Sequence, residues 1–376
     1  MSKVFYKVNA DRNAPWNNLP DLPINEELYQ TIEILKKLGD AKAALARLQG
    51  RSAVIPDQGL LINTISLQEA KTSSEIENIF TTDDELYKAY SDNSAESKGA
   101  SKEVIRYREA LWSGYNYLLE RGKFDQNYYV KVFQEITQSK EEIRPDFSNT
   151  TIKQRGTGPN AGKIVYTPPR GKEIIRKKLD NLTTFLNDDK QYKTDHLLKM
   201  AIAHYQFEVI HPFRDGNGRT GRILNINYLT HKNLLNLPIL FLSRYILDNK
   251  DDYYSGLMGV SQRGNWKDWI LYMMRAIEYT SNITYHKINE IVESKDLILN
   301  HIKKDKQRFR NPDKLIEALF TQPFTKVKHL TEAGIYAENT ARNYLNLLSE
   351  MGVLEKKELD GHHYYLNLEL HRILSE

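Results

Sequence analysis

The sequence predicts a mainly α-helical protein, and two observations support that prediction. Apolar residues recur at helical spacing in most segments of the 376-residue chain, as they do at Leu197, Ala201 and Phe207. Signals for strands are confined to two short stretches, residues 147–172 and 353–368. A chain of this length is expected to form two or three domains and to bury a sizeable core.

Composition narrows the function and the location that we expect. The formal net charge of +4 is small for this length, so bulk charge alone implies no nucleic-acid role. The absence of cysteine excludes disulfides, thiolate metal sites and cysteine nucleophiles. The first residues form no apolar signal segment, and no run of eighteen apolar residues occurs. We therefore expect a soluble cytoplasmic protein that has no membrane partner.

The N-terminal part is expected to form an irregular arm followed by helices. Residues 1–23 contain three prolines, which prevent regular structure. Asn25 is placed to cap a helix that Gly50 ends. The apolar side of this helix is formed by Leu28, Ile32, Leu35, Leu45 and Leu48. A break near Pro56 and Gly59 separates it from the next segment.

A polar stretch that ends at residue 78 allows two interpretations. Ser74 and Glu77 have the spacing of a capping box, Ser-x-x-Glu, which commonly marks the start of a helix. The second interpretation depends on a resemblance that the motif farther along the chain brings in. Residues 91–99, which are also polar, form the first plausible domain boundary.

Two helices and a glycine-rich stretch follow this boundary. Residues 102–122 and 124–136 each carry apolar side chains at helical spacing, and Pro145 closes the pair. Residues 147–172 contain four glycines around a short apolar run that begins at Ile164. This composition fits a short β-hairpin and an ordinary surface loop equally well.

The stretch His-Pro-Phe-Arg-Asp-Gly-Asn-Gly-Arg-Thr-Gly-Arg, residues 211–222, joins two predicted helices. Pro212 disfavours helical geometry at His211, so the preceding helix is expected to end there. Apolar residues then restart the helical pattern, namely Ile223, Leu224, Ile226, Leu229 and Leu234. The second half of the stretch therefore runs into the N-terminus of a helix.

This loop carries groups that bind phosphate. Gly216 and Gly218 allow an anion to approach the backbone N–H groups at the positive end of the helix. Arg219 and Arg222 lie on one helix face and can fork onto phosphate oxygens. The carboxylate of Asp215 can hold Mg²⁺ together with substrate phosphates.

His211 adds a general base to the phosphate site, because its unperturbed pKa suits proton transfer near neutral pH. The alternative is a glycine loop that merely joins two helices. That alternative does not explain why a histidine, an aspartate and two arginines accompany the glycines. The combination predicts transfer of a phosphate-containing group from a nucleotide.

Residues 211–222 resemble the signature of the Fic (filamentation induced by cyclic AMP) family, His-x-Phe-x-Asp/Glu-Gly-Asn-Gly-Arg-x-x-Arg, and meet each specified position. The resemblance implies an enzyme that transfers AMP from ATP to a Tyr, Thr or Ser hydroxyl of a protein, the chain itself included. It implies that His211 is the base and that Asp215 is the Mg²⁺ ligand. It implies catalytic roles for Asn217 and Arg219 as well. The ATP site that it implies comprises Glu77, Gly216, Asn217, Gly218, Arg219, Thr220, Gly221, Arg222 and Tyr253.

The resemblance also supplies the second interpretation of the stretch near residue 78. Ser73-x-x-x-Glu77-Asn78 is similar to the family's inhibitory motif, Ser/Thr-x-x-x-Glu-Gly/Asn. This implies that Ser73, Glu77 and Asn78 inhibit the enzyme through a pair between Glu77 and Arg222. The family also has a flap at the position of residues 147–172, where a target segment binds by strand addition.

Tyr253 is the expected contact for adenine or ribose, although the aromatic residues around it are equally suited to build a core. His204 and His231 are assigned to structure. The spacing of His204, Glu208 and His211 imitates a metal site, but no further ligand cluster supports one.

The C-terminal part is expected to be a separate small domain. Residues 287–311 form a polar helical linker, and three short helical patterns and a hairpin signal around Asp360-Gly361 follow it. The helical patterns span 315–320, 327–332 and 339–351, and the whole resembles a winged helix-turn-helix domain. DNA contacts would come from Thr340, Arg342, Asn343, Lys356 and Lys357. Winged helices also dock proteins or dimerise, and this one has no dense basic face.

The chain thus divides into an N-terminal helical region with the inhibitory motif (1–95), a Fic catalytic core (96–286), a linker (287–311) and a winged helix (312–376). Two alternatives to AMP transfer are kept. One is a transcriptional regulator that senses a nucleotide and binds DNA through residues 312–376. The other is an enzyme that removes AMP, with Glu77 orienting a water. Transfer of another phosphate-containing group and formation of a homo-oligomer are both compatible with the sequence.

Overall fold

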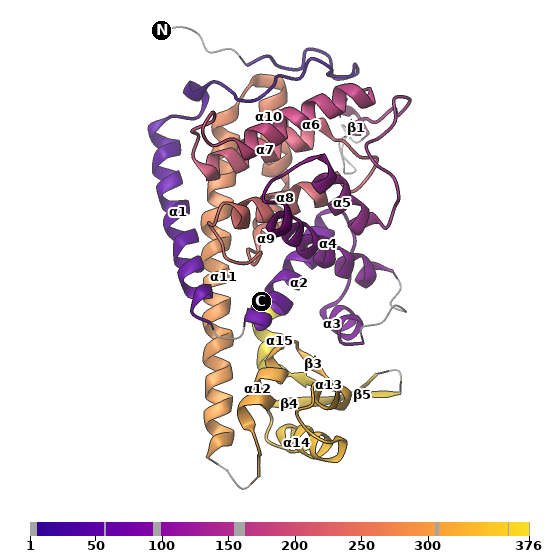
Figure 1. Cartoon of the computed structure of the whole chain (residues 1–376), viewed down its shortest axis with the longest axis vertical. Coiled ribbons are helices and arrows are strands. Elements are labelled where there is room, and N and C mark those ends of the chain that lie inside the picture. The colour runs from indigo at the N-terminus through magenta and orange to yellow at the C-terminus, as the bar shows by residue number, and fades with distance from the viewer. Residues whose placement is uncertain are drawn as a thin grey trace.

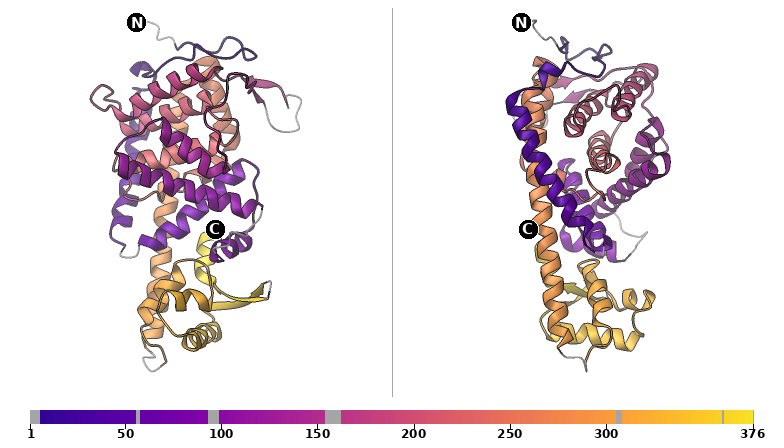
Figure 2. Two further views of the ribbon diagram at one scale, coloured as in Figure 1. Left: turned by 45° about the vertical axis from the view of Figure 1, so that its right-hand side comes forward. Right: turned by 60° about the vertical axis from the view of Figure 1, so that its left-hand side comes forward.

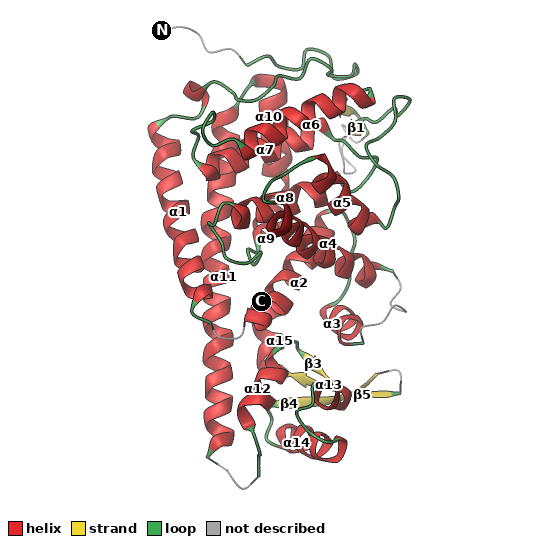
Figure 3. Ribbon diagram, viewed as in Figure 1, coloured by secondary structure: helices red, strands yellow, loops and turns green. Residues whose placement is uncertain are grey.

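Helices make up most of the computed structural model of the protein, and the strands are few and short (Figure 3). The structure describes residues 6–55, 58–92, 99–153, 162–304, 308–359 and 361–375. The prediction of a mainly α-helical fold is confirmed. Within the described residues, no helix is both long enough and apolar enough to cross a membrane.

The N-terminal arm leads into a 3₁₀ turn and a long helix. Asn25 accepts a hydrogen bond from the Glu27 amide at 3.0 Å and caps only the 3₁₀ turn Glu26–Leu28. Helix α1, Ile32–Ala53, has its own cap at Thr31 and continues through Gly50. The prediction of one helix from Asn25 to Gly50 was therefore wrong at both ends. The buried side of α1 packs along the last long helix of the core, and that packing holds Gly50 in helical geometry.

The capping-box interpretation of Ser74 and Glu77 was also wrong. Helix α2, Gln58–Ile76, contains Ser74 in its last turn, where the hydroxyl donates to the Ala70 carbonyl at 2.8 Å. Glu77 therefore follows the end of a helix, and the helix that comes next, α3 (Asp83–Ser91), is capped by Thr82. The predicted break at Pro56 lies outside the described residues.

Two helices and a hairpin follow. The helices α4 (Ala100–Arg121) and α5 (Gln126–Thr137) agree with the predicted pair. The glycine-rich stretch forms the antiparallel strands β1 (Ile152–Lys153) and β2 (Ile164–Tyr166), with Ile152 opposite Tyr166. Its tip, residues 154–161, lies outside the described part. Helix α6, Lys172–Asn187, follows the hairpin.

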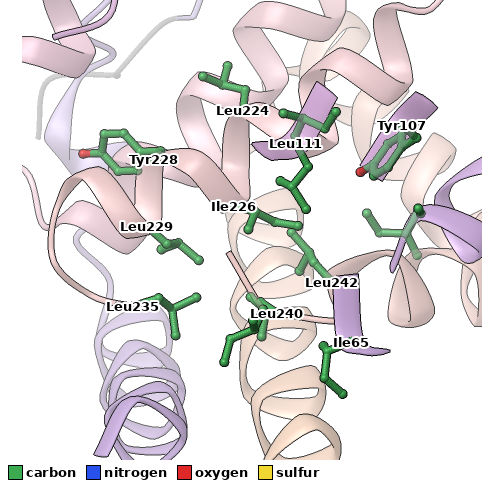
Figure 4. Close-up of a cluster of buried hydrophobic side chains, with 14 of the residues drawn as sticks. Ile65, Tyr107, Leu111, Leu224, Ile226, Tyr228, Leu229, Leu235, Leu240 and Leu242 are labelled. Atoms are coloured by element: carbon green, nitrogen blue, oxygen red, sulfur yellow. The ribbon is translucent and has the colours of Figure 1, made fainter. Parts of the chain in front are cut away.

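The loop of residues 211–216 lies between two buried helices, α7 (His196–Ile210) and α8 (Asn217–His231). Nearly every side chain of both helices is buried, which explains why their apolar pattern is weakly one-sided. Figure 4 shows part of the core around α8, where the buried side chains of Leu224 and Ile226 lie near Leu111 of α4.

Three more helices complete the core: α9 (Leu242–Asp248), α10 (Lys250–Arg263) and α11 (Trp266–Lys303). Helix α11 runs beside α1 and then extends beyond the core to the C-terminal domain (Figures 1 and 2). The polar segment predicted as a helical linker is thus, up to residue 303, a continuation of α11.

The C-terminal domain has the three helices and the hairpin that the sequence predicts. The helices are α12 (Pro312–Phe320), α13 (Val327–Glu332) and α14 (Glu338–Glu350). The strands are β3 (Phe324–Thr325), β4 (Leu354–Leu359) and β5 (His362–Asn367), in the antiparallel order β3-β5-β4. A final helix, α15 (Leu368–Ser375), was not predicted and packs its apolar side on α11.

Candidate functional site

His211 ends α7 in the left-handed region. Its φ of 49° is unusual for a residue with a side chain, and its amide donates to the Phe207 carbonyl at 3.0 Å. Pro212 cannot continue the helix, which explains why the chain turns here. The turn directs the imidazole out of the helix, and its Nδ1 atom lies 3.3 Å from the Glu208 carbonyl oxygen.

The loop after His211 is fixed by Phe213 and Asn217. Phe213 is fully buried and stacks on Phe133 of α5 with the ring centroids 4.1 Å apart. The Asn217 side chain accepts from the Phe213 amide and donates to the Phe213 carbonyl, both at 2.9 Å. Asn217 is 2% exposed, so it holds the loop closed around the start of α8.

Gly216 and Gly218 are each favoured at their position for a different structural reason. Gly216 caps α8 with a φ of 73°, which favours a residue without Cβ. Gly218 has ordinary helical geometry, but a Cβ added there would lie 2.5 Å from Glu77 Oε1 and 3.0 Å from Arg222 Nη1. The first backbone N–H groups of α8 have no acceptor within the helix, so this surface can bind an anion.

Arg222 is bound by Ser73 and Glu77 at the end of α2. It is 1% exposed and donates through Nε to Ser73 Oγ at 2.7 Å and through Nη2 to the Ser73 carbonyl at 2.9 Å. Its Nη2 also lies 3.0 Å from Glu77 Oε1. The structure thus brings Ser73, Glu77 and Arg222 together across 145 or more residues of sequence.

The end of α2 explains the residue after Glu77. Asn78 has a φ of 65°, and the Ile79 amide donates back to the Ser74 carbonyl at 3.0 Å. Such a helix end requires the left-handed conformation, which glycine and asparagine adopt most readily. The third position of the motif is therefore a helix terminator that fixes the direction of Glu77.

Arg219 lies near two solvent-accessible acids and has a hydrogen-bond donor that these acids do not use. Its Nη1 lies 3.3 Å from Glu103 of α4 and its Nη2 lies 3.8 Å from Asp215. Within the described residues its buried Nε atom has no hydrogen-bond partner. A buried donor without an acceptor at the start of α8 fits a group that receives an anionic ligand.

Asp215 fits a magnesium ligand by its exposure. Its side chain is 87% exposed, and its ion pair with Arg219 is long, at 3.8 Å. No group of three or more His, Cys, Asp or Glu in the described part could hold a metal by itself. That agrees with Mg²⁺ sites of nucleotide enzymes, where one or two carboxylates act together with phosphate oxygens.

The electrostatics keep His211 neutral. Burial, with the positive charge of Arg144 as the second cause, lowers the pKa of His211 to about 4. The imidazole is therefore unprotonated near neutral pH, as a general base must be. The tautomer that donates Nδ1–H to the Glu208 carbonyl leaves the Nε2 lone pair free.

Sequence reasoning missed two residues next to His211. Arg144 is 2% exposed and donates to the carbonyls of Ile210 and His211, and Glu208 carries a buried carboxyl oxygen without a hydrogen-bond partner in the described part. Glu208 was visible as a charged residue in an apolar helix, one turn before the histidine. Arg144 had no such signal, because its partners are main-chain atoms of a distant segment.

Tyr253 lies in the core beside the site. It is 2% exposed, its hydroxyl is 2.9 Å from His204 Nε2, and its ring packs near Trp269. His204 is fully buried, as the structural assignment of that histidine requires. A contact of Tyr253 with adenine or ribose stays a prediction.

The residues proposed for DNA contact are partly occupied within the protein. Arg342 of α14 lies 2.6 Å from Glu338 one turn earlier. Lys357 of the wing lies 3.4 Å from Asp84 of α3, so its charge faces the N-terminal region. Asn343 is exposed on α14.

Comparison with protein-family models gives three matches that together span most of the chain. Residues 35–116 match the Fic/DOC family N-terminal model and residues 123–229 match the Fic/DOC family model. Residues 295–370 match the C-terminal domain of SoFic-like protein adenylyltransferases.

Curated relatives resemble the central part of the chain. Protein adenylyltransferase fic-1 of Caenorhabditis elegans is 30% identical over 132 residues, which are 35% of this chain and 24% of the relative. Probable protein adenylyltransferase aq_aa38 of Aquifex aeolicus is 31% identical over 120 residues, 31% of this chain and 36% of the relative. The chain thus spans about a quarter to a third of the length of these relatives.

Solved structures show the same fold at low identity. A Fic family protein from Desulfovibrio desulfuricans aligns with a TM-score of 0.52 and 18% identity, covering 92% of this chain and 98% of that one. Fic-1 of C. elegans aligns with a TM-score of 0.53 and 17% identity, covering 69% of this chain and 74% of that one.

Proposed function

Because the chain belongs to the Fic/DOC family, we propose that it is a protein adenylyltransferase, which transfers AMP from ATP to a Tyr, Thr or Ser hydroxyl of a protein. The observation that carries the proposal is the geometry of residues 211–222. A neutral, partly buried histidine stands at the anion-binding end of α8, and two buried arginines lie within the first two turns of that helix.

The reaction is a displacement at the α-phosphorus. The target hydroxyl gives its proton to His211 Nε2 while its oxygen attacks the α-phosphorus in line. The bond from that phosphorus to the bridging oxygen breaks, and pyrophosphate leaves. The product is an AMP group esterified to the target side chain.

The start of α8 binds the triphosphate. Amides at Gly216 and Gly218 face the phosphoryl oxygens, and Asn217 keeps those amides in place through its two hydrogen bonds to Phe213. Arg219 and Arg222 neutralise the outer phosphates. Asp215 would hold Mg²⁺, which when bound neutralises charge on the phosphates. Thr220 and Gly221 complete the helical turn beneath these groups.

The hairpin β1–β2 presents the target. In this proposal an extended target segment binds to an edge of the hairpin as an added strand, and its hydroxyl is directed toward His211. Tyr166, at the base of the hairpin, donates its hydroxyl to the Val209 carbonyl at 2.7 Å. That bond ties the hairpin to the helix that carries the base.

Glu77 inhibits the enzyme in this proposal. Its carboxylate lies over Gly218 and on Arg222, where it excludes a γ-phosphate in its productive position. One charge-assisted hydrogen bond of this kind contributes about 1.5–3 kcal/mol. Roughly ten- to a hundredfold suppression follows from that energy.

The test is incorporation of label from ATP labelled at the α-phosphate. We expect Glu77→Gly to raise self-labelling by roughly ten- to a hundredfold over the natural chain. Adding His211→Ala to that variant is expected to abolish labelling, and mass spectrometry identifies the modified residues. Labelling that survives loss of His211 would exclude it as the base.

The same assay separates the alternative reaction. Glu77 lies close enough to His211 for its charge to act on the imidazole, so it could orient a water for AMP removal. Glu77→Gly would then lose the ability to release AMP from a modified protein without gaining transfer. We favour transfer because Glu77 is engaged by Arg222 rather than free to hold a water.

A further inference from the structure

Arg144 is a buried cation that contacts the catalytic histidine only through main-chain atoms. It lies in the segment between α5 and β1 and is 2% exposed. Its Nε donates to the His211 carbonyl at 2.8 Å, and its Nη2 donates to the Ile210 carbonyl at 3.4 Å. Its own amide donates to the Pro212 carbonyl at 2.9 Å. Three consecutive carbonyls at the end of α7 are thus bound by one residue.

The same guanidinium reaches the hairpin. Its Nη2 also donates to the carbonyl of Pro169, three residues after the end of β2. One planar group therefore connects the helix that carries the base with the base of the hairpin that holds the target. Only arginine has donors in a fork that can serve carbonyls of two different segments at once.

The charge of Arg144 is balanced by helix α7 rather than by an acid. Among the described residues, the hydrogen bonds of its guanidinium go to main-chain carbonyls and not to a carboxylate. The last carbonyls of a helix carry partial negative charge and receive no hydrogen bond from an N–H donor within the helix. Ile210 and His211 supply these carbonyls. A cation placed here is stabilised by the C-terminal end of α7.

The position of Arg144 allows it to stabilise the unusual backbone conformation of His211. Its left-handed backbone is unfavourable for a residue with a side chain and persists only where the surroundings enforce it. Arg144 binds the chain before, at and after His211, because it donates hydrogen bonds to the carbonyls of residues 210, 211 and 212. A clamp there fixes the direction of the imidazole.

We propose that Arg144 is a positioning residue that sets the general base His211 and the target-binding hairpin in register through its bonds to the end of α7 and to Pro169. The proposal rests on the proposed adenylyltransferase function. Arg144 touches neither nucleotide nor target. It acts through the groups that do.

The positive charge also acts on the base. The charged groups that influence the imidazole are Arg144 from the segment after α5, Glu77 at the end of α2 and Asp215 of the catalytic loop. Arg144 lowers the pKa of His211, whereas both acids raise it. Loss of the guanidinium therefore raises the pKa of His211 and moves the acid limb of the rate profile to higher pH.

The test uses the full chain carrying Glu77→Gly and ATP labelled at its α-phosphate, in single-turnover self-labelling. Arg144→Met is expected to lower the rate about a hundredfold, as a misplaced catalytic group does. The acid limb moves to higher pH, while the affinity for MgATP, measured by calorimetry, stays within about twofold because the start of α8 is untouched. Arg144→Lys keeps the charge, so it retains the acid limb and recovers part of the rate.

Arg176→Met is the matched control, because the Arg176 side chain on α6 is 40% exposed and pairs with Glu173 three residues earlier on the same helix. It is expected to label at the parent rate. Arg144→Met that labels normally would overturn the proposal. A loss of rate that Arg144→Lys does not restore, with an unmoved acid limb and a matching loss of MgATP affinity, would show a merely structural residue and overturn it too. Failure of the proposed function looks different, because Glu77→Gly itself would then show no His211-dependent label.

Discussion

At the scale of single residues, Glu208 places an acid where an anion is expected to bind. Its Oε1 atom occupies the space that a side chain at position 221 would fill, since a Cβ on Gly221 would lie 2.3 Å from it. Burial raises the pKa of Glu208 to about 7; the positive charge of Arg222 opposes the shift and Glu77 adds to it. The group is therefore a neutral acid at mildly acidic pH and a carboxylate at alkaline pH.

This titration predicts that ATP binding weakens as pH rises. The repelling charge of Glu208 is absent below the raised pKa and appears as the pH passes through it. In the Glu77→Gly form the midpoint lies lower, because Glu77 contributes to the raised pKa. We expect the dissociation constant for MgATP, measured by calorimetry from about pH 6 to about pH 9, to rise roughly three- to tenfold.

Glu208→Gln is the control for that measurement. It keeps the shape of the side chain and removes the charge, so the pH dependence should flatten to that of the nucleotide alone. An equally steep dependence in Glu77→Gly with and without Glu208→Gln would assign the effect to another group.

The sequence points to residues 211–222 as a candidate site because the groups that make it up are local. His211, Asp215 and Arg219 lie within nine positions, and the glycines between them require a tight turn whatever surrounds it. Arg144 and Glu208 could not be predicted in the same way. Arg144 binds main-chain carbonyls of a distant segment, and Glu208 fills the space left by the missing side chain of Gly221. Neither contact leaves a pattern in the sequence.

At the scale of elements, the inhibition that we propose for Glu77 depends on how α2 ends. The left-handed Asn78 and the bond from the Ile79 amide to the Ser74 carbonyl turn the chain immediately after Glu77. If the last turn of α2 unwinds, Glu77 loses its fixed direction toward Arg222. The inhibitory strength is therefore set partly by the helix terminus and not only by the ion pair.

Asn78→Val tests this dependence. A β-branched residue in the left-handed region costs about 1–2 kcal/mol. We expect the last turn of α2 to loosen and self-labelling to rise by up to about tenfold, whereas Asn78→Gly should leave labelling unchanged. Asn233→Val imposes a similar strain at an exposed position with a φ of 56° beyond the far end of α8. Equal effects of the two valine variants would contradict the role of the α2 terminus.

Element types could be predicted more readily than element ends. Apolar residues recur at helical spacing along α7 and, from Ile223 onward, along α8, which identifies helices whatever their partners. Gly50 was expected to end a helix, but packing of α1 along α11 outweighs its local preference. Ser74 was interpreted as the start of a helix because the same residues can form a capping box or lie at the end of a helix. Tertiary contacts decided each case.

At the scale of the whole molecule, the C-terminal domain contacts the end of α3, the helix that follows Glu77 in the sequence. Tyr364 of β5 donates to the carboxylate of Asp92 at 2.8 and 2.9 Å, and Lys326 pairs with the same carboxylate. His329 lies 2.9 Å from the Ser91 carbonyl. These contacts attach the domain to the end of α3, below the core in Figure 1.

Helix α3 in turn braces α2. Asp83 pairs with Lys71 of α2 at 2.9 Å, and Tyr87 hydrogen-bonds Gln68 of α2. A chain of contacts thus runs from the C-terminal domain through α3 to the helix that positions Glu77. Its physical consequence is a restraint on α2, which weakens when the domain releases α3.

Tyr364→Phe is the variant that isolates this restraint. It removes one hydroxyl from the contact with Asp92 and keeps the ring that packs in the domain. Loss of a charged hydrogen bond frees α3 only in part, so we expect initial self-labelling to rise roughly two- to fivefold. Tyr365→Phe is its matched control, since that hydroxyl donates to Asn346 inside the domain at 2.8 Å. A rise in Tyr364→Phe that Tyr365→Phe does not share would show that the C-terminal domain restrains the active site. Equal labelling rates in the two variants would show that the contact between Tyr364 and Asp92 does not restrain it.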